Sequence, residues 1–197
     1  MKKILATLLL TFSFQTQAQE SHDYSGYENY LNQLKTFEGH FSHTSNGKVG
    51  TGLLRISRPW KMRLDYDAPQ NLLVLTNKEW LLTYDKDLEE SNYLSLSSTP
   101  AEFILRPSIK FSGDVEVTNI IRKKDNITEI TLVKRDEHDA GHITLVFNES
   151  PLSLQEWTIV DAQGSRTTVQ LDGVKTDVKF PEKIFKFPKP SLMQQVF

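Results

Sequence analysis

The sequence predicts a mainly β protein: a meandering antiparallel sheet accompanied by a few helices. Turn-forming residues recur at regular intervals between β-type segments after Phe37. Residues 52–66 alternate apolar and polar side chains with a period of two, which is typical of a strand with one buried face. Only two short segments have helical spacing, so we expect the helices to lie on the sheet and not to form a core of their own.

The first eighteen residues are predicted to be a secretory signal peptide. Met1 to Lys3 is a cationic start, Ile4 to Phe14 is a mostly apolar run, and Thr16-Gln17-Ala18 has the small residues of a cleavage site. The run is too short to span a bilayer, which needs about 20 apolar residues, and no Cys follows it to receive a lipid. We therefore expect cleavage near Ala18, export to a bacterial periplasm, and one domain over residues 19–197.

The composition excludes several classes of protein. The chain has 197 residues, with 23 Lys+Arg against 25 Asp+Glu, so it lacks the basic field that would hold a nucleic acid by its phosphates. It has no Cys, which excludes a disulfide scaffold, a thiolate metal site and a Cys nucleophile. We expect no nucleic-acid partner, and a hydrophobic content of 38% suits a single core.

The elements are predicted in order along the chain. Asp23 to Lys35 suits a short amphipathic helix, and Asn46-Gly47 predicts a hairpin between strands at Phe37 to Thr44 and Gly52 to Ser57. Later β-type segments between turn signals are Leu72 to Thr76, Glu79 to Asp85, Val115 to Arg122, Ile127 to Lys134, His142 to Phe147, Leu154 to Val160 and Thr167 to Leu171. A second helix is predicted from Thr99 to Leu105, because Pro100 stands at its first position and Arg106-Pro107 ends it.

Arg58 is the one charged side chain on the apolar face of segment 52–66. The other members of that face are Leu54, Ile56, Trp60, Met62, Leu64 and Tyr66. Pro59 cannot donate to a ladder, so a break, bulge or edge is expected beside it. Two interpretations of Arg58 stay open. The guanidinium either reaches water past its own stem, or turns inward to carbonyls at the end of the Thr99 to Leu105 helix, since an unpaired buried charge is costly.

The apolar stripes raise a choice between a packed core and a lined hollow. Trp60 and Met62 are ordinary core fillers, and further stripes at a spacing of two run through Trp80 to Tyr84 and through Ile143 to Phe147. Two short helices can cover so broad a face only in part. The sequence therefore allows either a tightly curved barrel or a hollow lined by these side chains.

Several segments, in this order, resemble the periplasmic outer-membrane lipoprotein carrier family, LolA. They are Phe37-Glu38-Gly39-His40-Phe41, the Gly52 to Leu64 strand pair centred on Arg58-Pro59, Trp80 to Asp85, Thr99-Pro100, Arg166 to Leu171, and Lys179-Phe180 towards Phe187-Pro188. The resemblance covers most of the mature chain. Two departures stand out: the stretch between Asp85 and Thr99 is short, and Glu102 and Arg106 place charges in the second helix.

The resemblance implies an antiparallel half-barrel, that is an incomplete β-barrel, covered by a helical lid with acyl chains held on its apolar side. Arg58 matches the arginine that latches the lid to the sheet. The residues expected to line the acyl-chain cavity are Leu54, Ile56, Trp60, Met62, Leu64, Trp80, Leu82, Phe103, Ile104, Phe147 and Trp157.

The function that the resemblance implies is that of a monomeric carrier with neither catalysis nor a cofactor. It would take acylated lipoproteins from an inner-membrane ABC transporter and deliver them to an outer-membrane receptor. The alternative is an envelope sensor or structural interaction module of the same fold that binds a protein partner.

Other chemistries find little support in the sequence. His138 and His142 have the spacing of metal ligands on a helix, but Ala140-Gly141 between them indicates a turn, so no metal site is expected. Ser165 lacks the frame of a hydrolase nucleophile. A periplasmic hydrolase, which would depend on His138 or Ser165, is the third hypothesis.

Overall fold

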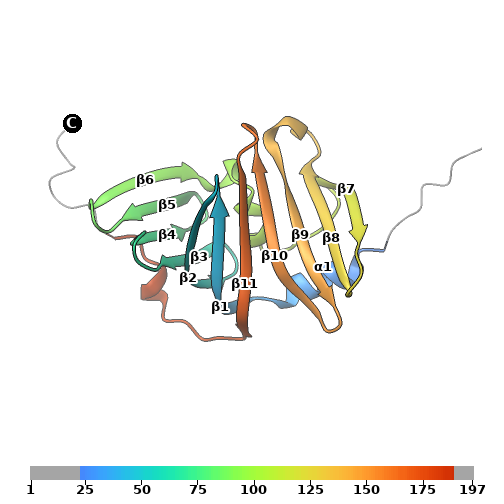
Figure 1. Ribbon diagram of the computed structural model, residues 1–197, viewed down its shortest axis with the longest axis horizontal. Helices are drawn as coiled ribbons and strands as arrows, with labels where there is room; N and C mark the ends of the chain where they lie inside the picture. The colour runs from blue at the N-terminus through green and yellow to red at the C-terminus, as the bar shows by residue number, and fades with distance from the viewer. Residues whose placement is uncertain (1–22, 189–197) are drawn as a thin grey trace, which may run out of the picture.

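The computed structural model describes residues 23–188, so the predicted signal peptide over residues 1–18 lies outside the described residues. The described chain forms one sheet of eleven strands in the order β6-β5-β4-β3-β2-β1-β11-β10-β9-β8-β7, and every neighbouring pair is antiparallel (Figure 1). The strands are β1 Thr36–Ser45, β2 Lys48–Ser57, β3 Lys61–Tyr66, β4 Leu72–Thr76, β5 Trp80–Asp85, β6 Glu90–Ser95, β7 Val115–Arg122, β8 Ile127–Lys134, β9 Gly141–Glu149, β10 Leu152–Asp161 and β11 Arg166–Thr176.

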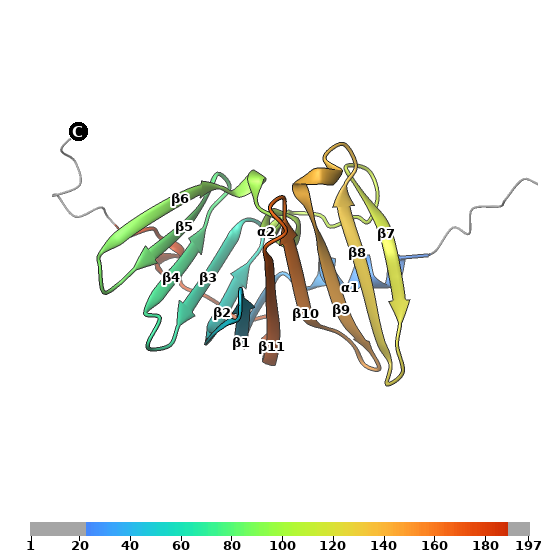
Figure 2. The ribbon, with the colours of Figure 1, turned by 45° about the horizontal axis from the view of Figure 1, so that its top comes forward.

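The sheet does not close on itself. β6 and β7 are its two edges, and β1 pairs with both β2 and β11, so it joins the first six strands to the last five. Helices α1 (Ser25–Gln33) and α2 (Ala101–Leu105) lie on the same side of the sheet (Figure 2). The short 3₁₀ turns are η1 Leu96–Ser98, η2 His138–Ala140 and η3 Glu182–Phe185. The predicted fold class, a mainly β incomplete barrel with a few helices, is confirmed.

The β1–β2 hairpin forms where the sequence places it. Ser45 pairs with Lys48, and the two residues between them, Asn46 and Gly47, have φ of +49° and +75°. A two-residue hairpin with a matching twist needs positive φ at both central positions, which Asn and Gly tolerate best. The local sequence therefore fixes the register of β1 on β2.

The alternation of segment 52–66 persists across a break. β2 ends at Ser57 and β3 begins at Lys61, so the expected interruption falls at Pro59. The side chains of Leu54, Ile56, Met62 and Leu64 are buried at 0–8% exposure, and Leu54 pairs with Leu64 across the two strands. Both strands thus present an apolar face towards the helices. We call this side of the sheet the helix-covered face.

The main core lies between the helix-covered face and the two helices. α2 has only five residues, too few for a stable isolated helix, but its Phe103, Ile104 and Leu105 are buried at 0–6% exposure in the same cluster as Leu54. Burying a side chain of this size stabilises the fold by about 1.5–3 kcal/mol. Packing on the sheet is therefore what holds α2 in place.

A second, smaller cluster lies on the opposite face of the sheet and corrects one expectation. Leu82 packs with Leu73 and Leu75 in this second cluster, and Trp80, two residues earlier on the same strand, is 43% exposed. The reason is the turn between β4 and β5. Thr76 pairs with Leu81, so an even-numbered residue of β4 points to the same face as an odd-numbered residue of β5. Trp80 and Leu82 therefore do not line the helix-covered face, whereas Leu81 packs against the main core.

Strand β6 was not predicted from the sequence. Its residues Glu90–Ser95 are mostly exposed, so they lack the alternation that marks a half-buried strand. Strands β9, β10 and β11 also extend beyond their predicted ends. β11 continues to Thr176, five residues past the predicted Leu171, because β1 supplies partners for its exposed end.

Candidate functional site

The guanidinium of Arg58 meets the C-terminal ends of both helices. Its Nε and Nη2 donate to the carbonyl oxygen of Arg106 at 3.2 and 3.1 Å, and its Nη1 donates to the carbonyls of Leu31 and of Leu34, the latter at 3.3 Å. The last carbonyls of a helix lack partners within the helix and carry partial negative charge, which suits a cation. The inward interpretation of Arg58 is confirmed: the residue is 9% exposed, and burial lowers the pKa of its guanidinium.

The backbone of the turn that carries Arg58 holds the same helices. The Arg58 amide donates to the carbonyl of Lys35 and the Trp60 amide to that of Leu105, both at 2.8 Å. Trp60 has a φ of +71°, a left-handed conformation that a non-glycine residue keeps only when its surroundings impose it. The Thr76 hydroxyl supplies part of that constraint, because it donates to the Trp60 carbonyl at 2.8 Å. The turn is thus fixed to the sheet and binds the helices.

Two polar side chains of α1 attach that helix to the segment following α2. The Asn32 side chain pairs with the backbone of Ile109 in both directions, as donor to its carbonyl and acceptor from its amide, each at 2.8 Å. Glu28 accepts the amide of Phe111 at 2.7 Å and the ammonium of Lys110 at 2.8 Å. α1, α2 and the segment Ile109–Phe111 therefore form one connected cover, which we call the lid assembly.

The charges of α2 pair with each other on the lid assembly. Arg106 and Glu102 form an ion pair at 2.6 Å, and the Arg106 guanidinium lies 5.1 Å from the centre of the Phe103 ring. Arg106 also reaches Asp114 at 3.1 Å. These contacts explain how a short helix on an apolar face carries two charged residues.

The structure brings most of the predicted cavity residues together, but it packs them. Eight belong to one buried cluster and a ninth, Trp60, packs against it; the eight are Leu54, Ile56, Met62, Leu64, Phe103, Ile104, Phe147 and Trp157. Trp80 and Leu82 lie apart from them, as described above. The buried side chains of the lid assembly and the sheet pack against one another in this single cluster. Any ligand on the helix-covered face must displace the lid assembly.

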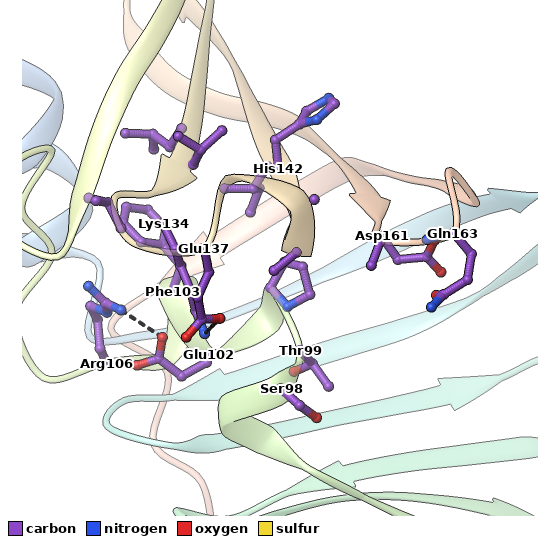
Figure 3. A pocket seen from close by; sticks show the side chains of 18 residues that line it. Ser98, Thr99, Glu102, Phe103, Arg106, Lys134, Glu137, His142, Asp161 and Gln163 are labelled. Atoms are coloured by element: carbon purple, nitrogen blue, oxygen red, sulfur yellow. Dashed lines mark hydrogen bonds and ion pairs between the residues drawn. The ribbon is translucent and has the colours of Figure 1, made fainter.

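A cavity of about 300 Å³ opens beside the first turn of α2. Its lining comes from α2, from the ends of β8 and β9 and from the β10–β11 loop (Figure 3). Of the predicted cavity residues, Phe103 lines it. No local pattern in the chain indicated this cavity, because its walls come from four separate parts of the chain.

The residues considered for other chemistries have structural partners. His138 pairs with Glu116 at 2.9 Å, and the Ser165 amide donates to Asp161 within a turn. Across residues 23–188, no group of three or more His, Cys, Asp or Glu side chains could hold a metal ion. Within the same range, no helix has the length and apolar character needed to cross a membrane.

These features define a class of protein: an incomplete antiparallel barrel whose apolar face is closed by two short helices latched through a buried arginine. A family model described as "Outer membrane lipoprotein carrier protein LolA" matches residues 32–188. The chain belongs to the LolA family, and the predicted family membership is confirmed.

Relatives match along most of their length. The outer-membrane lipoprotein carrier protein of Legionella pneumophila (strain Corby) is 26% identical over 200 residues, covering 96% of each chain. That of Pseudomonas putida is 24% identical and covers 95% of this chain and 94% of the relative. An uncharacterized protein of Rickettsia prowazekii is 28% identical over 196 residues, covering 98% of this chain and 90% of the relative.

Two solved structures align with most of this chain. A LolA superfamily protein from Nitrosomonas europaea has a TM-score of 0.46 and 12% identity, covering 83% of this chain and 97% of that one. MucB has a TM-score of 0.47 and 14% identity, covering 87% of this chain and 65% of that one. Both scores lie below 0.5, so the family assignment rests on the sequence match.

Proposed function

We propose that this protein is a periplasmic carrier that binds the acyl chains of lipoproteins on the helix-covered face. It would receive lipoproteins released from the inner membrane by an ABC transporter and deliver them to an outer-membrane receptor. The proposal is supported by membership of the LolA family and by one observation, the closure of an apolar face by a lid assembly that a single buried arginine latches. Such a carrier needs neither catalysis nor a cofactor, and we expect it to act as a monomer.

The energetics explain why a carrier needs an apolar face. Exposing acyl chain to water costs about 0.8 kcal/mol per CH₂, which amounts to on the order of 10 kcal/mol for a long chain. The face that carries Leu54, Ile56, Met62 and Leu64 would replace water around that chain. The carrier must also release its cargo, so the bound state cannot be too stable.

The Arg58 latch meets the need for release. In the closed form, the guanidinium satisfies carbonyls of Leu31, Leu34 and Arg106. Acyl chains that displace the lid assembly would separate Arg58 from these acceptors, and a buried charge without partners is costly. Closure of the latch would therefore compete with cargo and favour its transfer to the receptor.

The test is transfer of a lipoprotein from the loaded carrier to the outer-membrane receptor. We expect Arg58→Leu to take up cargo and to hand it over more slowly than the wild type, because leucine makes the face more apolar and removes the competing closure. Arg166→Leu, at an exposed arginine on β11, is the matched control and is expected to transfer at the wild-type rate. Equal rates for Arg58→Leu and wild type would contradict the latch.

A second candidate function is an envelope sensor or structural interaction module that binds a protein partner. Three exposed apolar side chains near the β6 edge favour it: Trp80, Tyr93 and Leu94 are 43%, 42% and 48% exposed. Mass spectrometry of the protein recovered from the periplasm without detergent separates the two. Co-purified acylated lipoproteins support the carrier, and a stable protein complex without acyl chains supports the module.

A further inference from the structure

The cavity beside α2 has an apolar floor that is part of the main core. Phe103, Val115, Leu132 and Ile143 line the cavity, yet each is only 1–4% exposed and belongs to the main buried cluster. The floor of the cavity is therefore the outer surface of the core at one end of the barrel. An apolar group that enters here contacts the core without crossing a polar layer.

The rim of the same cavity is polar. In Figure 3, Asp161 and Gln163 lie on one side, and Glu102 and Lys134 lie on the other. The ammonium of Lys134 donates to the Ser97 carbonyl at 3.1 Å, which links β8 to the turn before α2. An apolar floor beneath a rim of donors and acceptors suits an amphiphile whose alkyl part points inward and whose polar head stays at the surface.

The cavity is present while the latch is closed, and it runs along α2 as far as Arg106, the residue whose carbonyl the latch binds. Arg58 and Trp60 hold the C-terminal end of the helix through the carbonyls of Arg106 and Leu105. Ser98, Thr99 and Glu102 line the cavity at the N-terminal end of α2, and Arg106 lines it at the C-terminal end. Arg58 and Trp60 do not line the cavity, so an alkyl chain that enters beside Phe103 would contact α2 before any hydrogen bond of Arg58 is broken.

We infer that this cavity is the entry site for the first acyl chain of the cargo, occupied while the latch is still closed. The inference rests on the proposed carrier function and adds the route by which cargo reaches the packed face. A volume of about 300 Å³ lies at the low end of ligand pockets and accommodates part of one chain, not a whole triacylated anchor. The entry site therefore governs rates, while the helix-covered face governs affinity.

The test is a variant that fills the entry site without touching the core. Ala162 lines the cavity from the β10–β11 loop and is exposed, so Ala162→Trp adds an indole at the rim and removes no buried contact. Ala68→Trp, at an exposed alanine in the turn between β3 and β4, is the matched control. The probe is a synthetic lipopeptide with one pyrene-labelled acyl chain, mixed with the cargo-free full chain in a stopped-flow fluorimeter.

We expect Ala162→Trp to slow both association and dissociation by about tenfold, within the one to three decades over which association rates vary among variants of one site. The equilibrium affinity should stay within twofold of the wild type, because an obstructed entrance slows both directions equally, and Ala68→Trp should match the wild type throughout. A wild-type association rate in Ala162→Trp would overturn the inference. So would a loss of affinity at an unchanged association rate, which would place the cavity in the final binding site.

Failure of the inference and failure of the proposed function can be told apart. If the wild-type chain takes up no lipoprotein in the transfer assay, the carrier function is wrong. If the wild type carries lipoprotein but Ala162→Trp binds the lipopeptide as fast as Ala68→Trp, only the entry site is wrong.

Discussion

Asn32 connects α1 to the segment that follows α2 within the lid assembly. Its side chain satisfies both backbone groups of Ile109, a residue that is only 1% exposed. Asn32→Ala would leave that amide and carbonyl without these partners, and each buried unsatisfied group costs about 1–3 kcal/mol. We expect the free energy of unfolding to fall by at least this amount, measured as a lower urea midpoint with an unchanged m-value. Asn29→Ala, at an exposed position of the same helix, should change stability by less than about 0.5 kcal/mol.

The raised pKa of Tyr66 predicts that the stability of the fold decreases at alkaline pH. Its ring packs edge-on against Phe41 at 5.0 Å, and burial raises the pKa of its phenol from 10.0 to about 12. The raised pKa means that, between these values, the unfolded state loses a proton that the folded state keeps, so stability falls as pH rises. We expect the free energy of unfolding to decrease over this interval, and to decrease less in Tyr66→Phe. Identical slopes in the two proteins would show that Tyr66 does not titrate in this way.

At the scale of elements, the contacts predict that α1, α2 and Ile109–Phe111 open together. The Trp60 amide donates to α2 from outside the lid assembly, whereas the amides of Ile109 and Phe111 donate to α1 within it. Arg58→Leu removes hydrogen bonds from a charged donor, each worth about 1.5–3 kcal/mol, so we expect hydrogen exchange at the Trp60 amide to accelerate by roughly ten- to hundredfold. Exchange at the Ile109 and Phe111 amides should stay slow, because their acceptors on α1 move with them. Amides in the β10–β11 ladder should be unaffected. Acceleration at Ile109 and Phe111 as well would mean that α1 separates from the segment after α2 and that the assembly does not open as one unit.

The elements also show what the sequence could predict and where it stopped. The β1–β2 hairpin was predictable because Asn46 and Gly47 determine the turn locally, and Arg58 because it interrupts a clean apolar stripe. The side of the sheet on which Leu82 lies was not predictable, because it depends on the number of residues between the paired Thr76 and Leu81. Pairing of Asn32 with Ile109 joins residues 77 positions apart, and no local pattern in the chain marks such a contact.

At the scale of the whole molecule, the sheet is one body with two open edges. β1 lies near its centre and pairs with β2 and β11, so the two halves of the chain share a continuous ladder. The main core likewise includes Leu54 from β2 and Trp157 from β10. Opening the lid assembly can therefore expose the apolar face while the sheet behind it stays intact. That division of roles is what a carrier that loads and unloads requires.

The continuous sheet predicts that residues 19–197 unfold as a single domain. Trp80 is 43% exposed on β5, towards one edge, and Trp157 is 4% exposed on β10, in the other half. The chain has three tryptophans, so two variants are needed. One keeps only Trp80 and the other keeps only Trp157, with the remaining two tryptophans replaced by Phe in each. Because β1 pairs with strands of both halves, we expect the sheet to unfold in one step. In each single-tryptophan protein, the urea transition followed by fluorescence should coincide with the transition followed by circular dichroism. A fluorescence midpoint that differs from the circular dichroism midpoint would show that the two halves unfold separately. The boundary between two domains would then lie at β1.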